Sequence, residues 1–337
     1  MDTMKAAVLH GVKDLRVVDV PKAQAGANGV LIKVNTVGVC GTDLHTYKLG
    51  MFKEMSLPQP EGVLFGHEFA GEVVDVGPGA AVEGIGVGDR VVGVALGAYA
   101  EYCSVTSVLS DRPLVVKIPD GVSYEEAATV EPLVVSLTAV RRAGLQGGER
   151  VLVTGAGMIG LGCVQVIKAL HPTCEVVVTD VSDKRLAMAR QFGADRTLNV
   201  TQEALVPALK GLAGETRAMY APTTSGNIDV AIEASGLGGP LNDALELLRP
   251  RTGRLVCVAL YEQTPQVDFN QIVAKNLKVK GTLGYGEADV RAALSLIAEG
   301  RVDRKPLITH RYPLADAAEA FAAQLDTSET LKAVIQP

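Results

Sequence analysis

Four side chains that can do chemistry lie close together in the segment VGVCGTDLHTYK, residues 37–48. Cys40 offers a thiol, Thr42 a hydroxyl, Asp43 a carboxylate and His45 an imidazole. A cysteine thiolate can bind a metal, and an imidazole can move a proton near neutral pH. Each of the four also has an ordinary structural use, because cysteine is a common core residue and the other three are frequent in turns. The segment alone decides little.

Further metal-binding residue types follow in GHEFAGEVV, which contains His67 and Glu68, and in EPL, which begins at Glu131. Cysteine, histidine and glutamate are all zinc ligands, and three protein ligands with one open position are typical of catalytic rather than structural zinc. Taken singly, Cys40, His67 and Glu131 could equally be packing or helix-end residues. Spacing alone therefore leaves both interpretations open.

The strongest local pattern is VLVTGAGMIGLG, residues 151–162. Its glycines Gly155, Gly157 and Gly160 lie between a predicted strand and a predicted helix, and the next strand ends in Asp180, 20 residues later (180 − 160). Such a turn binds a dinucleotide: the first glycine permits the tight turn, the second admits the pyrophosphate, and the third allows close packing of helix and strand. The pattern predicts a nucleotide site.

The type of nucleotide follows from Asp180, which is expected to accept the ribose hydroxyls of an adenosine and to repel a 2′-phosphate. This favours NAD over NADP. Arg185, five residues later, could support some NADP binding, and Ile159 belongs to the same predicted turn. The alternative is a glycine-rich turn that binds no ligand.

Composition and charge exclude several classes of protein. The 337 residues are 47% hydrophobic and 21% charged, which fits a folded chain of two domains. With 32 basic against 38 acidic residues and no basic run interleaved with aromatics, we expect no nucleic-acid partner. The five cysteines are scattered and no signal-peptide pattern is present, so we expect a cytoplasmic protein. The uncharged run 151–167 is glycine-rich and shorter than the roughly 20 residues of a membrane span, so no membrane partner is expected.

The pattern of apolar residues changes along the chain, from one typical of strands to one in which strands and helices alternate. The first third consists of short apolar segments broken by Gly and Pro, which is typical of a β-rich region. Ser123, with Glu126 three residues later, predicts a helix start, and a second helix is expected after Pro132. Apolar strands then alternate with helices predicted over 158–170, 182–192 and 240–248. This alternation predicts a parallel sheet covered on both faces, so the fold class is α/β.

The motifs together resemble the zinc-dependent medium-chain dehydrogenase/reductase family, in the same order and over nearly the whole chain. EPL and the C-terminal LITHRYPL are most similar to the polyol (sorbitol) and 2,3-butanediol dehydrogenases. The resemblance implies a β-rich GroES-like catalytic domain, residues 1–136 completed by 287–337, and a Rossmann doubly wound parallel-sheet domain, residues 137–286. The segments that carry it are VGVCGTDLHTY, GHEFAGEVVDVG, GVGDRVVG, AYAEYCSV, VEPLVVSLTAVRRAG, VLVTGAGMIGLG and DVAIEASG.

The metal ligands implied by the resemblance are Cys40 and His67, joined by a glutamate. Glu68 matches a ligand or near-ligand that can exchange with water and so take part in catalysis. Glu131 occupies the place where classical alcohol dehydrogenases use a cysteine. Which of the two glutamates is the resting third ligand stays open.

The resemblance also implies a path for the proton that the alcohol loses. Thr42 matches the residue that takes this proton, and His45 matches the one that relays it to solvent. Asp43 matches a carboxylate that orients His67. Lys332 matches a basic residue near the cofactor phosphates, the alternative being a solvated lysine.

One part of the family pattern is missing. In many relatives, four closely spaced cysteines that hold a structural zinc follow the segment equivalent to GVGDRVVG, whereas here residues 91–99 lead directly into AYAEYC. We therefore expect one catalytic zinc per chain and no structural zinc.

The implied activity is zinc- and NAD-dependent oxidation of a secondary alcohol, in particular a vicinal diol or polyol, to a ketone by reversible hydride transfer. The alternatives are a zinc-free quinone or enone reductase of the same fold and a non-catalytic nucleotide-binding protein. The expected partners are a small alcohol or ketone and further copies of the chain, as a homodimer or homotetramer. The segment LKVKGTLG is the expected pairing edge.

Overall fold

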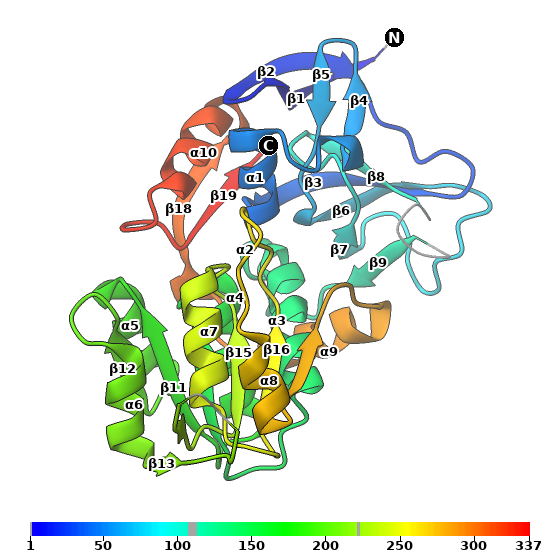
Figure 1. The fold of residues 1–337 in the computed structure, drawn as a ribbon. Helices are drawn as coiled ribbons and strands as arrows, with labels where there is room; N and C mark the ends of the chain where they lie inside the picture. Colours follow the sequence, from blue (N-terminus) through cyan, green and yellow to red (C-terminus); the bar gives the residue numbers. More distant parts are fainter. Residues whose placement is uncertain (1, 107–112, 221–222) are drawn as a thin grey trace. The chain divides into compact units, whose positions relative to one another are not determined.

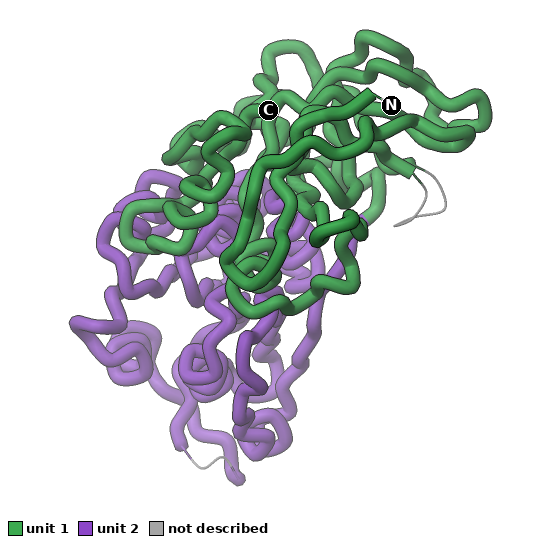
Figure 2. Tube along the Cα trace, turned by 90° about the horizontal axis from the view of Figure 1, so that it is seen from above, with its two compact units in different colours: residues 1–131, 286–337 green, residues 132–285 purple. Residues whose placement is uncertain are grey.

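The computed structural model describes residues 2–106, 113–220 and 223–337, and the chain divides into two compact units. Unit 1 comprises Met1–Glu131 and Gly286–Pro337, and unit 2 comprises Pro132–Tyr285 (Figure 2). The C-terminal segment thus returns to the unit formed by the N-terminal one. None of the helices in the described ranges is long and apolar enough to cross a membrane.

Unit 1 is rich in β-structure (Figure 1). One sheet has the order β2-β1-β5-β4, and a larger one has the order β18-β19-β3-β6-β7-β9, with β8 also paired to β3. The strands are β1 (Thr3–Gly11), β2 (Asp14–Pro21), β3 (Val30–Gly38), β4 (Leu57–Gln59), β5 (Gly62–Leu64), β6 (Glu68–Val76), β7 (Arg90–Val94), β8 (Tyr102–Val105), β9 (Leu114–Lys117), β18 (Ile308–Pro313) and β19 (Lys332–Gln336). The helical elements are α1 (Gly41–Leu49), η1 (Lys53–Met55), α2 (Tyr124–Ala128), α9 (Glu287–Ala298), η2 (Lys305–Leu307), η3 (Leu314–Asp316) and α10 (Ala317–Leu325).

The core of unit 1 is built from alternate residues of these strands. In β3 the side chains of Val30, Ile32 and Val34 are buried, whereas Lys33 between them is exposed. This is the alternation that the pleat of a strand imposes. Phe321 of α10 packs into the same core, so the C-terminal segment helps to close it.

Unit 2 contains a six-stranded parallel sheet of order β12-β11-β10-β15-β16-β17. Its apolar strands are separated by helices, as the sequence predicts for a doubly wound sheet. The strands are β10 (Arg150–Thr154), β11 (Glu175–Asp180), β12 (Arg196–Asn199), β15 (Val230–Glu233), β16 (Arg254–Cys257) and β17 (Lys278–Gly281), with a small pair β13 (Glu215–Thr216) and β14 (Ser225–Gly226). The helices are α4 (Met158–Leu170), α5 (Asp183–Gln191), α6 (Leu205–Ala213), α7 (Gly238–Leu247) and α8 (Phe269–Lys275), and α3 (Val130–Ala143) leads into this unit.

Two of the predicted helix starts, at Ser123 and near Pro132, can be compared with the structure. Ser123 caps α2 through the backbone N–H of Glu126, whose carboxylate accepts the N–H of Ser123 in return. The helix predicted after Pro132 begins two residues earlier, at Val130. Proline is tolerated there because N–H groups in a first helical turn have no partner within the helix.

Candidate active site

Helix α1 carries the side chains of the segment that follows β3. Cys40 is its N-cap residue, and the Asp43 carboxylate accepts the Cys40 N–H at 3.3 Å. Gly50 ends the helix in a left-handed conformation with φ of 69°. Although Thr42, Asp43 and His45 are residue types frequent in turns, the structure contains a nine-residue helix here, with capping bonds at both ends.

The pairing of β3 with β6 brings the second set of residues to this helix. In the antiparallel register Gly38 pairs with Glu68, so the chain before Cys40 lies beside the start of β6. Gly66, with φ of 95°, turns the chain directly before His67. The ligand atoms of Cys40, His67 and Glu68 consequently lie within 4.8 Å of one another.

This group fits a zinc ion by donor type and by spacing. Sulfur, imidazole nitrogen and carboxylate oxygen are its usual ligands, and ligands of a tetrahedral zinc lie roughly 3.5 Å apart. Three protein donors would leave a fourth position open. Glu131 is buried near the start of α3, and in the described part of the chain its carboxylate does not belong to this group. The structure therefore brings together three of the four predicted ligands.

Charges around the group set the state of His67. Its Nδ1 lies 3.5 Å from the Asp43 carboxylate, which leaves Nε2 for a metal. Burial acts to lower the pKa of His67, but the negative charges of Asp43 and Cys40 outweigh it and hold that pKa well above its usual value. Burial, together with the Glu68 carboxylate, raises the pKa of Cys40. A divalent cation would reverse both effects by favouring the thiolate and the neutral imidazole.

Glu68 has a buried cationic partner. The Lys332 ammonium donates to Glu68 Oε2 at 2.6 Å and to the Val39 carbonyl at 2.8 Å. The two side chains are only 3% and 1% exposed. Lys332 is thus neither solvated nor remote from the predicted ligands, although 264 residues separate it from Glu68.

The two residues predicted to handle the proton lie on α1, which begins directly after Cys40. Thr42 donates its hydroxyl hydrogen to Cys40 Sγ at 3.2 Å. The His45 ring stands edge-on to Phe52, with ring centroids 6.4 Å apart. Both sit within five residues of Cys40, so the hydroxyl and the imidazole belong to the same short helix as one predicted ligand.

In unit 2 the glycine turn joins β10 to α4 as predicted. Gly155 adopts φ of 90°, and a Cβ added there would lie 3.0 Å from the Ser235 Cα. A Cβ at Gly160 would overlap the carbonyl oxygen of Gly155. Above Gly157, by contrast, a Cβ would meet only the Arg185 guanidinium, at 3.9 Å. The turn is thus tight on two sides and open at Gly157, at the N-terminus of α4, as a pyrophosphate site requires.

Asp180 ends β11 beside this turn. Its carboxylate accepts the N–H of Ala156 at 2.7 Å and that of Ser182 at 2.9 Å. Arg185 lies close enough for the Asp180 charge to act on it. Ile159 is held through its backbone carbonyl, which accepts the Ser136 hydroxyl at 2.9 Å. The predicted nucleotide residues of unit 2 therefore gather at the carboxyl ends of β10 and β11, whereas Lys332 lies in unit 1 beside Glu68.

Sequence reasoning missed Glu233, a fully buried carboxylate at the end of β15. Its Oε1 accepts the Ser235 N–H at 2.8 Å and the Gly236 N–H at 3.1 Å, and its Oε2 accepts the Tyr261 hydroxyl at 2.7 Å. Burial and Glu233 together raise the pKa of Tyr261, which keeps it a donor. Its hydrogen bonds fix the loop that packs on Gly155. In the sequence, the feature that could have indicated Glu233 is an acidic residue at the end of the apolar strand in DVAIEASG.

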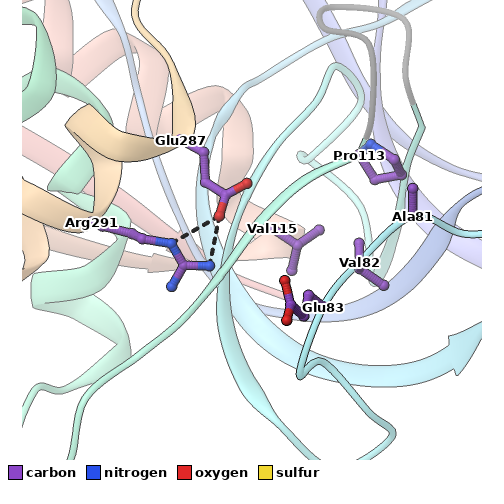
Figure 3. Close-up of a pocket in the computed structure, with 7 residues that line it drawn as sticks. All are labelled: Ala81, Val82, Glu83, Pro113, Val115, Glu287 and Arg291. Carbon is purple, nitrogen blue, oxygen red and sulfur yellow. Dashed lines mark hydrogen bonds and ion pairs between the residues drawn. The ribbon is translucent and has the colours of Figure 1, made fainter.

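A pocket of about 330 Å³ lies elsewhere in unit 1 (Figure 3). Its polar lining consists of Glu83, Glu287 and Arg291, and the last two form an ion pair along α9. It contains none of the predicted site residues.

Comparison with known proteins agrees with this architecture. Residues 26–120 match the alcohol dehydrogenase GroES-like domain and residues 159–299 match the zinc-binding dehydrogenase family. The chain is 34% identical to (R,R)-butanediol dehydrogenase of Bacillus subtilis, over 99% of this chain and 100% of that protein. It is 33% identical to bovine (Bos taurus) sorbitol dehydrogenase, over 93% and 91% of the two chains. The crystal structure of 2R,3R-butanediol dehydrogenase from Bacillus subtilis superposes with a TM-score of 0.83 at 31% identity, covering 99% of both chains.

The fold and the two sites define an oxidoreductase with a GroES-like unit and a dinucleotide-binding unit. The chain belongs to the zinc-dependent medium-chain dehydrogenase/reductase family, in the group that contains the butanediol and sorbitol dehydrogenases. This membership supports a zinc ion and a nicotinamide cofactor, and it does not favour the zinc-free reductase.

Proposed function

We propose that this protein oxidises a secondary alcohol, in particular a vicinal diol or polyol, to a ketone with NAD, and catalyses the reverse reduction. The observation that carries the proposal is the group formed by Cys40, His67 and Glu68, which is a zinc-competent donor set in a chain related throughout its length to butanediol and sorbitol dehydrogenases. In this proposal residues 1–136 and 287–337 form the catalytic domain and residues 137–286 the NAD domain.

Cys40, His67 and Glu68 would hold one zinc ion per chain, and Glu131 is the second glutamate that would serve as a ligand in place of Glu68. A bound zinc supplies a Lewis acid that lowers the pKa of an alcohol toward neutrality. We further propose that no structural zinc is bound, because the sequence carries no set of four closely spaced cysteines between β7 and β8.

Thr42 and His45 move the alcohol proton. The Thr42 hydroxyl, which lies against Cys40 Sγ, accepts the proton while passing its own hydrogen on. His45 delivers the proton to solvent, because an imidazole exchanges protons near pH 7. Asp43 fixes the ring of His67 through Nδ1.

For NAD, the backbone around Gly155, Gly157 and Gly160 receives the pyrophosphate at the N-terminus of α4. Ile159 lies in the same turn. Asp180 accepts the adenosine ribose hydroxyls, exchanging its bond with Ala156 for them. Arg185 lies over Gly157, where its charge can contact a phosphate.

Lys332 was predicted to lie near the cofactor phosphates. Its bonds to Glu68 and Val39 support a different role, which is to neutralise Glu68 when that carboxylate is not bound to metal.

We propose a homodimer or homotetramer assembled through β17, the edge strand of the parallel sheet. All four residues of β17 are exposed, and exposed Phe269, Val273 and Leu283 flank it in sequence. The unpaired backbone groups of an edge strand can pair with a second copy, and the exposed apolar residues beside it would be covered by that contact. Light scattering should give two or four times 35.2 kDa, and Val279→Asp should lower that mass. The free cysteines support a reducing, cytoplasmic location.

The experiment that tests the function is NADH formation from (R,R)-2,3-butanediol and from sorbitol by the purified zinc-loaded protein. His67→Ala should abolish turnover, whereas His310→Ala on β18 is the matched control that should keep it. Turnover that survives His67→Ala, or a quinone reduced without zinc, would favour the zinc-free reductase. NADH binding without turnover of any alcohol would favour the non-catalytic protein.

A further inference from the structure

Tyr99 is a fully buried tyrosine between β7 and β8. Its ring packs edge-on against Phe65 and Phe321, with ring centroids 5.1 and 5.2 Å away. A phenylalanine could make the same ring contacts, so packing does not explain why a hydroxyl is present at this position. A buried hydroxyl is costly unless it is hydrogen-bonded.

The Tyr99 hydroxyl lies 2.6 Å from Asp43 Oδ2 and 3.0 Å from the Gly38 carbonyl oxygen. A tyrosine has one hydrogen to donate. The shorter distance and the negative charge direct it to Asp43, because bonds to a carboxylate are shorter and stronger than bonds to a neutral carbonyl. Burial and the Asp43 charge also raise the pKa of Tyr99 well above its usual value, so the phenol stays protonated.

Asp43 connects this hydroxyl to the metal ligands. The oxygen that accepts from Tyr99 also accepts the Cys40 N–H at 3.3 Å, and its other oxygen faces His67 Nδ1 at 3.5 Å. Because Asp43 is only 4% exposed, the protein holds this carboxylate with little help from bulk water. Removing the Tyr99 hydrogen bond would therefore let the carboxylate turn, and His67 with it.

The backbone and ring of Tyr99 also support the turn that precedes His67. The Tyr99 N–H donates to the Phe65 carbonyl at 3.3 Å, and the Ala98 N–H donates to the Gly66 carbonyl at 3.1 Å. A Cβ at Gly66 would lie 2.7 Å from two Tyr99 ring carbons, so the ring packs directly under the turn before His67.

We propose that Tyr99 is a positioning residue of the metal centre: its hydroxyl fixes Asp43, and Asp43 fixes the imidazole of His67 for metal binding. The inference rests on the proposed zinc site and goes beyond it, since the Tyr99 hydroxyl bonds to Asp43 and Gly38 and not to one of the predicted metal ligands. Residues that act through a ligand in this way change metal affinity by about 10–100-fold when they are altered.

The test is the zinc affinity of Tyr99→Phe, measured by competition with a chromophoric chelator and independently of turnover. We expect zinc binding about tenfold weaker than in the wild type, with a changed visible spectrum of the cobalt-substituted protein. Tyr47→Phe is the matched control. Tyr47 is also buried and packs on the same Phe321 ring, with centroids 5.2 Å apart, and its affinity should stay within about twofold of the wild type.

A double-mutant cycle separates positioning from packing. In an Asp43→Asn background, Tyr99→Phe should weaken zinc binding by less than about twofold, because the hydroxyl acts only through the carboxylate. The inference would be overturned if the double variant lost zinc affinity by the product of the two single-variant factors, or if Tyr99→Phe bound zinc as tightly as the wild type. Either result would leave the zinc site itself intact. A wild-type protein that binds no zinc would overturn the proposed function and this inference together.

Discussion

The ion pair between Lys332 and Glu68 gives the sharpest prediction of stability. We consider Lys332→Met, which keeps most of the side-chain volume and removes the charge. The partners are 3% and 1% exposed and 2.6 Å apart, so they belong with buried pairs rather than with surface pairs worth about 0.2–1 kcal/mol. Removing one partner of a buried pair leaves an uncompensated charge and costs about 3–5 kcal/mol. The metal-free variant should lose stability of that order.

Zinc should restore most of the lost stability of Lys332→Met, because a bound zinc ion would again place a positive charge next to the Glu68 carboxylate. By linkage, each 1.4 kcal/mol that is restored corresponds to about tenfold tighter zinc binding by the variant. The assay is urea-induced unfolding followed by circular dichroism, with and without zinc. The double variant Glu68→Gln/Lys332→Met is the control and should recover most of the metal-free stability. A metal-free loss below about 1 kcal/mol, or a double variant as unstable as the single one, would refute this reasoning.

Three further predictions concern the cofactor, the proton and pH. Asp180→Ser should narrow the preference for NAD over NADP, because it removes the carboxylate beside the glycine turn; an unchanged ratio of kcat/KM values would contradict the assignment. His45→Ala should lower the rate at neutral pH more than at high pH, where hydroxide accepts the proton directly, and an equal loss at every pH would argue against a relay. Burial lowers the pKa of Lys275 to about 8 from 10.5. Between these pH values the unfolded chain binds more protons than the folded one, so the contribution of Lys275 to stability should rise with pH, and Lys275→Met should remove that rise.

The parallel sheet and its turn were predictable because their signals are local. The helix predicted over 158–170 is observed as α4 with those bounds, and Asp180 ends β11 as expected. The Ser123 capping pattern is likewise confirmed. In each case a few neighbouring residues fix the conformation, through a glycine turn, a cap or an apolar run.

Helix α1 shows where local signals fail. Thr42 and Asp43 have side chains that compete with the backbone for hydrogen bonds, so the local sequence gives no clear signal for a helix. The helix forms because Asp43 caps it and Tyr99, 56 residues away, holds that same carboxylate. Such a tertiary contact leaves no pattern in the sequence around α1.

The residues of the candidate metal site could be predicted from the sequence, but their contacts in space could not. Resemblance to a family pointed to Cys40, His67 and Glu68, and the register of β3 with β6 brings them together. The partnership of Glu68 with Lys332 joins the first third of the chain to its last strand. The pairing of both β19 and β6 with β3 makes these two residues neighbours.

The central claim is that Cys40, His67 and Glu68 form one zinc site that supports NAD-linked alcohol oxidation. The most direct measurement is zinc per chain by elemental mass spectrometry, on protein purified without added metal, for the wild type and for Cys40→Ser. We predict a value near one for the wild type and near zero for the variant, with loss of diol-dependent NADH formation in parallel. A wild-type value near zero that added zinc does not restore, or one zinc retained by Cys40→Ser, would contradict the claim.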